Sequence, residues 1–141
     1  MNALRSILVV ACGTALFAAG CGYESSTRRT GETTVHGDDG EKLTIAQPKI
    51  QDITRGGTET VTINLRRDNF SDPVNVSISD LPSGVEAVDA PRSTSGDEVE
   101  IVLRARDDAD LVSNHVVLVS AEGPDGIRAT ESFRLTVKEK D

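Results

Sequence analysis

The sequence predicts an all-β sandwich of about seven antiparallel strands in the C-terminal two thirds of the chain. Three observations lead to this prediction. Apolar and polar residues alternate in short runs, turn-forming residues separate the runs, and no segment carries a sustained helical period. The runs recur at intervals of about 8–12 residues, which is typical of strands in a two-sheet sandwich.

The first predicted strand opens at Leu43-Thr44-Ile45 and is interrupted by Pro48. Because proline has no amide hydrogen to donate to a sheet, we expect an edge strand or a bulge here, as when a first strand switches from one sheet to the other. Arg55-Gly56-Gly57 then predicts a tight turn before the second strand.

Each later strand is predicted to turn its apolar residues inward and its polar residues outward. The inward residues are expected to be Val61, Ile63 and Leu65, then Val74, Val76 and Ile78, then Val99, Ile101, Leu103 and Ala105, then His115, Val117, Val119 and Ala121, and finally Phe133, Leu135 and Val137. A short fourth strand is expected over residues 85–88. Gly123-Pro124-Asp125-Gly126 is the strongest hairpin signal in the chain.

This succession resembles the immunoglobulin-like and fibronectin-III-like modules of bacterial envelope and secreted proteins. The resemblance rests on Phe70-Ser71-Asp72-Pro73-Val74, on Leu81-Pro82-Ser83-Gly84-Val85 and on the last three strands. It implies a seven-stranded antiparallel immunoglobulin-like β-sandwich over residues 43–138. Such modules serve in adhesion, spacing and binding alike, so the resemblance implies a fold rather than one activity. His115 stands where these modules often carry a tyrosine.

Residues 1–20 have the parts of a secretory signal peptide: a positive charge at Arg5, an apolar run and small residues at its end. The run of about 14 residues is shorter than the roughly 20 that cross a bilayer. Ala18-Ala19-Gly20-Cys21 resembles the lipobox of bacterial lipoproteins. That resemblance implies cleavage before Cys21 and attachment there of a diacylglycerol and an N-acyl chain such as palmitate. The alternative is an ordinary secreted protein cleaved nearby.

Residues 21–42 are polar, contain several glycines and show no apolar period, which predicts a lipidated cysteine followed by a disordered linker. Gly22 follows the cysteine. In the enteric lipoprotein pattern an aspartate at that position retains the protein in the inner membrane, so we expect outer-membrane placement where the organism has an outer membrane. His36 beside Asp38 and Asp39 is better explained as solvated charge than as a metal site.

Composition argues against several classes of partner. The chain carries a net charge of −8, which disfavours nucleic acid and anionic lipid surfaces. One tyrosine, three phenylalanines and no tryptophan make carbohydrate stacking unfavourable. Cys12 lies inside the predicted signal peptide, so the mature domain has no cysteine pair and no disulfide.

No motif typical of catalysis occurs: neither Gly-x-Ser-x-Gly nor His-Glu-x-x-His nor a phosphate-binding loop is present. His115 is the single histidine of the predicted domain, and we expect it to face inward and to hydrogen-bond backbone as a tyrosine would there. The sequence therefore predicts a non-enzymatic membrane-anchored lipoprotein that acts as a protein-interaction or structural module, with another envelope protein as its partner.

Acidic loop residues suggest an alternative function. In a sandwich, alternate loops share one end, which would bring together Asp68, Asp72, Asp97, Glu122 and Asp125. Carboxylates from several loops can bind Ca²⁺, although no EF-hand spacing is present, so the alternative is a calcium-dependent adhesion or accessory module. Phe70 in the same loops is either an exposed contact residue or a cover for the end of the core. Exposed strand edges leave strand addition open as a binding mode.

Overall fold

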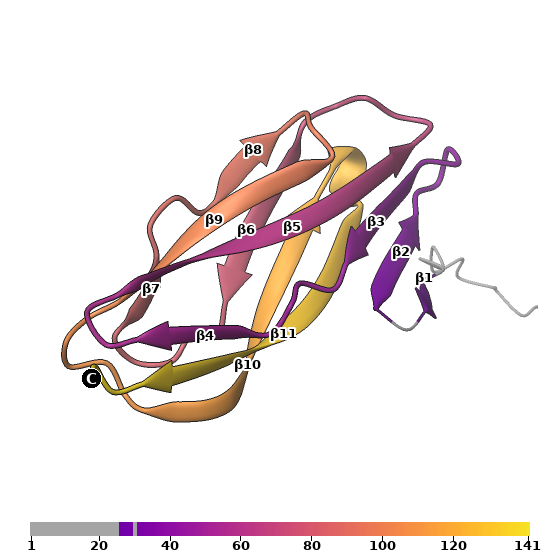
Figure 1. Cartoon of the computed structure of the whole chain (residues 1–141). Helices are drawn as coiled ribbons and strands as arrows, with labels where there is room; N and C mark the ends of the chain where they lie inside the picture. Colours follow the sequence, from indigo (N-terminus) through magenta and orange to yellow (C-terminus); the bar gives the residue numbers. More distant parts are fainter. Residues whose placement is uncertain (1–25, 30) are drawn as a thin grey trace, which may run out of the picture.

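The computed structural model describes residues 26–29 and 31–141, and the side chains of residues 31–141. Two sheets pack face to face (Figure 1). The first has the order β1-β2-β3-β5-β9-β7 and the second β4-β11-β10-β6-β8. Their bounds are β1 Ser26–Arg29, β2 Glu32–His36, β3 Lys42–Ala46, β4 Gln51–Thr54, β5 Thr58–Asp68, β6 Val74–Ser79, β7 Val85–Ala87, β8 Arg92–Thr94, β9 Glu98–Ala105, β10 Val112–Glu122 and β11 Arg128–Lys138. The described domain is an immunoglobulin-like β-sandwich, which confirms the predicted fold class.

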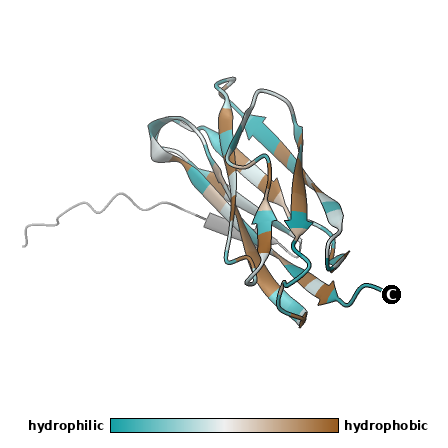
Figure 2. Cartoon of the chain, turned by 90° about the vertical axis from the view of Figure 1, so that its left-hand side faces the viewer, coloured by the Kyte–Doolittle hydropathy of each residue, from teal (hydrophilic) through white to brown (hydrophobic). Residues whose placement is uncertain are grey.

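The core lies between the two sheets and contains most of the residues that the period-two pattern predicted to face inward, although Ile78 is only partly buried and Val35, Ala109, Ile127 and Ala129 join the core without having been predicted. Among its largest fully buried side chains are Leu43, Ile45, Ile63, Ile101, Leu103, Phe133 and Leu135. Figure 2 shows the resulting alternation of hydrophobic and hydrophilic residues along the strands. The predicted hairpin at 123–126 is also confirmed, because Pro124–Gly126 forms a short 3-10 turn between the antiparallel strands β10 and β11.

Pro48 lies where the chain passes from one sheet to the other, as predicted. Before it, β3 pairs with β5 in the first sheet, and after it β4 pairs with β11 in the second. The β4–β11 pair is parallel, an exception to the antiparallel arrangement expected throughout. Within the described chain, the switch leaves residues 58–64 of β5 paired only with β9, and residues 128–134 of β11 paired only with β10.

The predicted linker over residues 21–42 is wrong for its described part. Residues 26–36 contain the β1–β2 hairpin, and β2 continues the first sheet beyond β3. Thr33 and Val35 are 8% and 5% exposed, so this strand contributes to the core. With one apolar residue, β2 carries too little hydrophobic pattern to be recognised. Its place is fixed by contacts with β3 and β11 that lie far away in the sequence.

Two further short strands complete the edges of the sandwich. The expected fourth strand is β7, which pairs with β9 at the edge of the first sheet. The chain then crosses to the second sheet, where β8 pairs with β6. The sequence did not predict β8, because Arg92-Ser93-Thr94 offers no apolar residue to mark it.

The predicted signal peptide and Cys21 lie outside the described residues. Within the described ranges, no helix has the length and apolar character needed to cross a bilayer.

Candidate functional site

One end of the sandwich gathers the loops that carry the predicted acidic set. Arg67, at the end of β5, holds two of these loops together, and its side chain is only 9% exposed. Its guanidinium donates to the carbonyl oxygens of Asp72 (3.4 Å) and Gly96 (3.0 Å), and to that of Ser95. The loops around Asp72 and Asp97 therefore share one end, as the sequence predicted.

Three of the acidic side chains at this end are paired with different arginines. Asp97 lies 3.3 Å from Arg67, Glu122 lies 3.1 Å from Arg128, and Asp68 lies 3.7 Å from Arg66. In the part of the chain that the structure describes, no group of three or more His, Cys, Asp or Glu side chains is placed to hold a metal ion. The metal site predicted at Asp68, Asp72, Asp97, Glu122 and Asp125 finds no support in this geometry. Calcium binding stays a prediction, and a rise in melting temperature with millimolar Ca²⁺ would be needed to support it.

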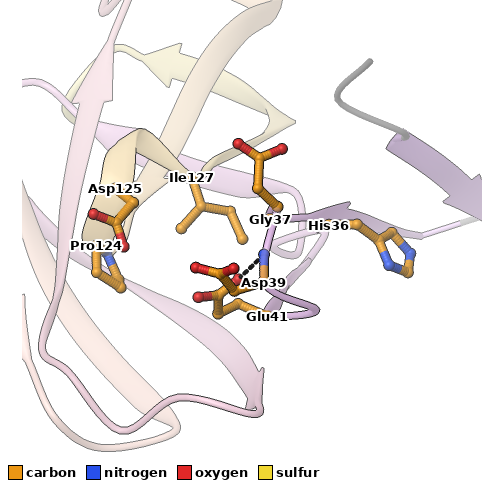
Figure 3. Close-up of a pocket in the computed structure, with 8 residues that line it drawn as sticks. His36, Gly37, Asp39, Glu41, Pro124, Asp125 and Ile127 are labelled. Atoms are coloured by element: carbon orange, nitrogen blue, oxygen red, sulfur yellow. Dashed lines mark hydrogen bonds between the residues drawn. The ribbon is translucent and has the colours of Figure 1, made fainter. Parts of the chain in front are cut away.

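A hollow of about 310 Å³ lies at the same end, between the β2–β3 turn and the β10–β11 turn (Figure 3). Asp39, Glu41 and Asp125 line it, while the imidazole of His36 points away from them. Glu41 accepts a hydrogen bond from the backbone N–H of Asp39 (3.1 Å), so this carboxylate orders the turn. His36 and its acidic neighbours do not form a metal-binding arrangement.

Phe70 covers the end of the core at this end. Its side chain is partly buried and packs against the core cluster. A Cβ atom at Gly123 would lie 3.5 Å from Cε2 of Phe70, so the ring lies directly over this glycine. The geometry agrees with the covering role considered for Phe70, and a role in binding stays a prediction.

The opposite end brings together the loop after β6 and residues 106–111. Asp110 donates its backbone N–H to Ser83 (2.9 Å), and Arg106 donates to Gly84 (2.9 Å). Gly84 has φ +83°, and a Cβ there would lie 2.5 Å from Cα of Ala109, so only glycine fits. The two loops are locked against each other through backbone.

His115 has the structural role that the sequence predicted. Its Nε2 lies 2.7 Å from the carbonyl oxygen of Asp80, which ties β10 to the end of β6. The ring shares the inward register of Val117 and Val119 but is only partly buried, because it lies at the end of the core.

The flank of the sandwich at the strand switch carries the other notable hollow, of about 550 Å³. One wall is the segment between β3 and β4, where Ile50 is 67% exposed. The other wall is β5, through Glu59, Thr60, Thr62 and Asn64, together with Glu98 of β9. We call this the β5 groove.

Two charged residues with structural roles were missed in the sequence, Glu131 and Arg67. Glu131 of β11 is 3% exposed and accepts a hydrogen bond from the hydroxyl of Thr33 (2.5 Å). A signal was present: Glu131 lies two residues before Phe133, and Arg67 lies two residues after Leu65, so both fall in an inward register. A charged residue there requires a partner from another element.

Solved structures of immunoglobulin-like domains are similar to this chain. A chimeric titin Z1Z2 carrying a KLER peptide from decorin is 22% identical, covers 70% of this chain and 95% of its own, and gives a TM-score of 0.43. A titin M10 complex with an obscurin-like 1 immunoglobulin domain is 14% identical, covers 84% and 99%, and gives 0.45. The BIgI domain of beta protein from S. agalactiae, solved bound to CEACAM1, is 15% identical, covers 72% and 99%, and gives 0.40. No protein-family model and no curated protein matches the chain.

Proposed function

We propose that the protein is a lipid-anchored envelope lipoprotein whose immunoglobulin-like domain acts as a non-enzymatic protein-interaction or structural module. The observation that supports this best is the position of the fold relative to the lipobox. The first described strand starts at Ser26, five residues after Cys21 (26 minus 21). A domain so close to the predicted lipid is placed to work beside the membrane surface.

The short connection constrains the orientation of the domain. Ser26 pairs with Val35, next to the 37–41 turn, so the chain enters the sandwich at the end that carries this turn and the 123–127 turn. Five residues span at most roughly 17 Å when fully extended. With Cys21 lipidated, this acidic end faces the membrane and the end with His115 faces away. The partner then lies no farther from the membrane than one domain of this size extends.

The contacts of the titratable side chains support a binding role over catalysis. His115 is held by a backbone carbonyl, and His36 points away from its acidic neighbours. Asp97 and Glu122 are each occupied by an arginine. A nucleophile with an adjacent base, the minimum for covalent catalysis, is not formed by these groups.

The proposal is tested by fractionation and cross-linking of the native protein in its own envelope, followed by mass spectrometry. Cys21→Ser removes the predicted lipid site, and Cys12→Ser is the matched control because it changes a cysteine of the signal and leaves the lipobox intact. We expect the wild type and Cys12→Ser to stay in the membrane fraction and to cross-link reproducibly to one partner through one surface.

The outcome that contradicts anchoring is equal membrane retention of Cys21→Ser. The outcome that contradicts a binding module is cross-linking only to abundant neighbours, at the same yield per molecule in the Cys21→Ser variant.

A further inference from the structure

The β5 groove runs along the edge of β5 that faces away from β9, where part of this strand's backbone N–H and C=O groups point. The amide of Leu65 donates to Asp97, and the carbonyl of Gly57 accepts from Ala105, so the odd-numbered residues of β5 direct their backbone groups toward β9. Because these directions alternate along a strand, Thr60, Thr62 and Asn64 direct their N–H and C=O groups to the other side. The ladder with β3 stops at Ile45 and Leu65, before these residues.

The space on that side is large enough to be a binding site. The hollow of about 550 Å³ lies along Thr60, Thr62 and Asn64, with the segment from Gln47 to Gln51 as its outer wall. Pro48 at the start of this wall has no amide hydrogen, so it cannot itself complete the ladder on β5. A strand edge next to a hollow has the features that accept an extended peptide by strand addition.

Among the described strands, residues 58–64 form an open side of seven residues, as long as that of residues 128–134 of β11. The terminal strands of the two sheets are short: β1 and β4 have four residues each, and β7 and β8 have three. Short edges are one way in which proteins avoid unwanted pairing. The seven residues at 58–64 include no proline or lysine, the residues that protect edges elsewhere.

The side chains around the edge specify the chemistry of the occupant. Glu59 and Glu98 place two carboxylates on the groove, against one cation at Lys49. Ile50 offers an apolar surface. Glu98 pairs with Asn64 and shares its outward face, while Glu59 lies in the register of Val61 and Ile63 on the other face. An extended segment that alternates basic and apolar residues therefore places its basic residues on the face of Glu98 and its apolar residues on the other face, because residues of one face repeat every second position along a strand.

We propose that residues 60–64 of β5 form the partner-binding edge of this domain, and that it binds an extended segment with alternating basic and apolar residues from another envelope protein. The inference deepens the proposed function and rests on it, since it assigns the interaction surface. The partner strand hydrogen-bonds to the backbone of Thr60, Thr62 and Asn64. Its basic side chains lie on the outward face, which Glu98 shares with Asn64.

The test is hydrogen exchange at residue resolution on the full chain in detergent micelles. The probe is a capped hexapeptide of alternating lysine and valine. Without peptide, the amides of Thr60, Thr62 and Asn64 exchange rapidly, while those of Val61 and Ile63 exchange slowly. With millimolar peptide, the three rapid amides become protected. Rapid exchange of all five amides, or protection by the peptide at a different edge, overturns the proposal.

Two matched controls separate strand addition from loose adhesion. The same peptide, N-methylated at alternate residues, keeps its charge but loses backbone hydrogen-bond donors, so it gives the β5 amides no protection from exchange. Glu98→Lys weakens the lysine peptide by about fivefold, the size of one exposed ion pair, and strengthens a glutamate–valine peptide. Equal binding of the methylated peptide, or no effect of Glu98→Lys, contradicts the assigned edge.

Thr62→Pro removes one edge donor and abolishes protection, with Thr62→Val as the control that keeps the backbone intact. If protection of the same amides rises with protein concentration in the absence of peptide, the occupant is a second copy and the proposed partner is wrong. A failed peptide test leaves the cross-linking test of the proposed function unaffected, since that test detects binding through any surface.

Discussion

The switch of the chain from the first sheet to the second leaves a gap in strand pairing at β5 and another at β11, and the two gaps differ in what covers them. Because the chain leaves the first sheet after β3, residues 58–64 of β5 are paired only with β9. Residues 128–134 of β11 are paired only with β10, because β4 joins β11 from Leu135 onward. The gap at β11 is covered: Gln47 donates its side-chain amide to the carbonyl of Ser132 (3.0 Å), and Thr33 of β2 donates to Glu131. The gap at β5 opens onto the groove.

The difference teaches that this fold closes an edge through specific polar contacts from elsewhere in the chain. At β11, the covering strand β2 supplies one apolar residue to the core, Val35, and one hydroxyl to a buried carboxylate. In the part of the chain that the structure describes, no hydrogen bond joins the segment from Gln47 to Gln51 to residues 58–64 of β5. The two gaps should therefore respond very differently to mutation.

Deletion of the covering hairpin should have the largest effect. Removing residues 26–36 exposes Glu131 and the core beneath Val35, and we expect a loss of about 3–5 kcal/mol in the free energy of unfolding. Urea denaturation measures this, with deletion of the exposed residues 139–141 as the control that costs little. A change below about 1 kcal/mol would show that the hairpin does not close the sandwich.

A single hydroxyl should account for part of that loss. Thr33→Val keeps the shape and removes the donor to Glu131, which leaves this carboxylate with one hydrogen bond fewer at 3% exposure. We expect a loss of about 1–3 kcal/mol. Thr33→Ser retains the hydroxyl and should cost clearly less in the same denaturation experiment. Equal losses for the two variants would assign the effect to packing.

Gln47 lies between the two gaps: its side-chain amide donates to the carbonyl of Ser132 in β11, and the same residue lines the β5 groove. Gln47→Ala should cost about 0.5–1.5 kcal/mol, the net value of one hydrogen bond. Gln51→Ala is the matched control, because its amide donates only to nearby Lys49 (3.2 Å). Thermal denaturation of both variants compares them, and a larger shift for Gln51→Ala would contradict the bridging role.

The smallest effect is expected in the groove itself. Thr62→Val exchanges one β-branched residue for another on an outward face, so stability should change by less than about 0.5 kcal/mol. A loss above about 1 kcal/mol in denaturation would indicate that the Thr62 hydroxyl has a structural partner, and the groove would then resemble the covered gap.

The sequence was sufficient where local pattern and packing agree. Apolar and polar residues alternate around Ile63, Ile101 and Leu135, which predicted core strands that the fold confirms. Apolar residues at every second position of a strand lie on one face, so they are buried together. Pro48 predicted the sheet switch for an equally local reason, its missing amide. The backbone partner of His115 was expected from the resemblance, since these modules often carry at this position a tyrosine that hydrogen-bonds backbone.

The sequence was insufficient where one element depends on another far away. Strand β2 falls within the predicted linker because only Val35 marks it, and its stability comes from pairing with β3 and from Glu131, 98 residues beyond Thr33. The acidic loops suggested a metal site because the sequence does not show that Asp97 pairs with Arg67, which lies 30 residues earlier in the chain. A charged residue in an inward register, such as Arg67 or Glu131, is the feature of the sequence that indicates a partner from another element.

The open edge of β5 also bears on how such molecules behave when they are crowded in the plane of a membrane. Two copies meeting through this edge would form a twofold antiparallel pair, in which each surface contacts its own duplicate. Such a pair would bring together two acidic edges, each with Glu59 and Glu98, of chains that each carry a net charge of −8. Like charges disfavour that pairing. The carboxylates to which we assign a basic partner would thus also keep two neighbouring copies from pairing and leave the edge vacant.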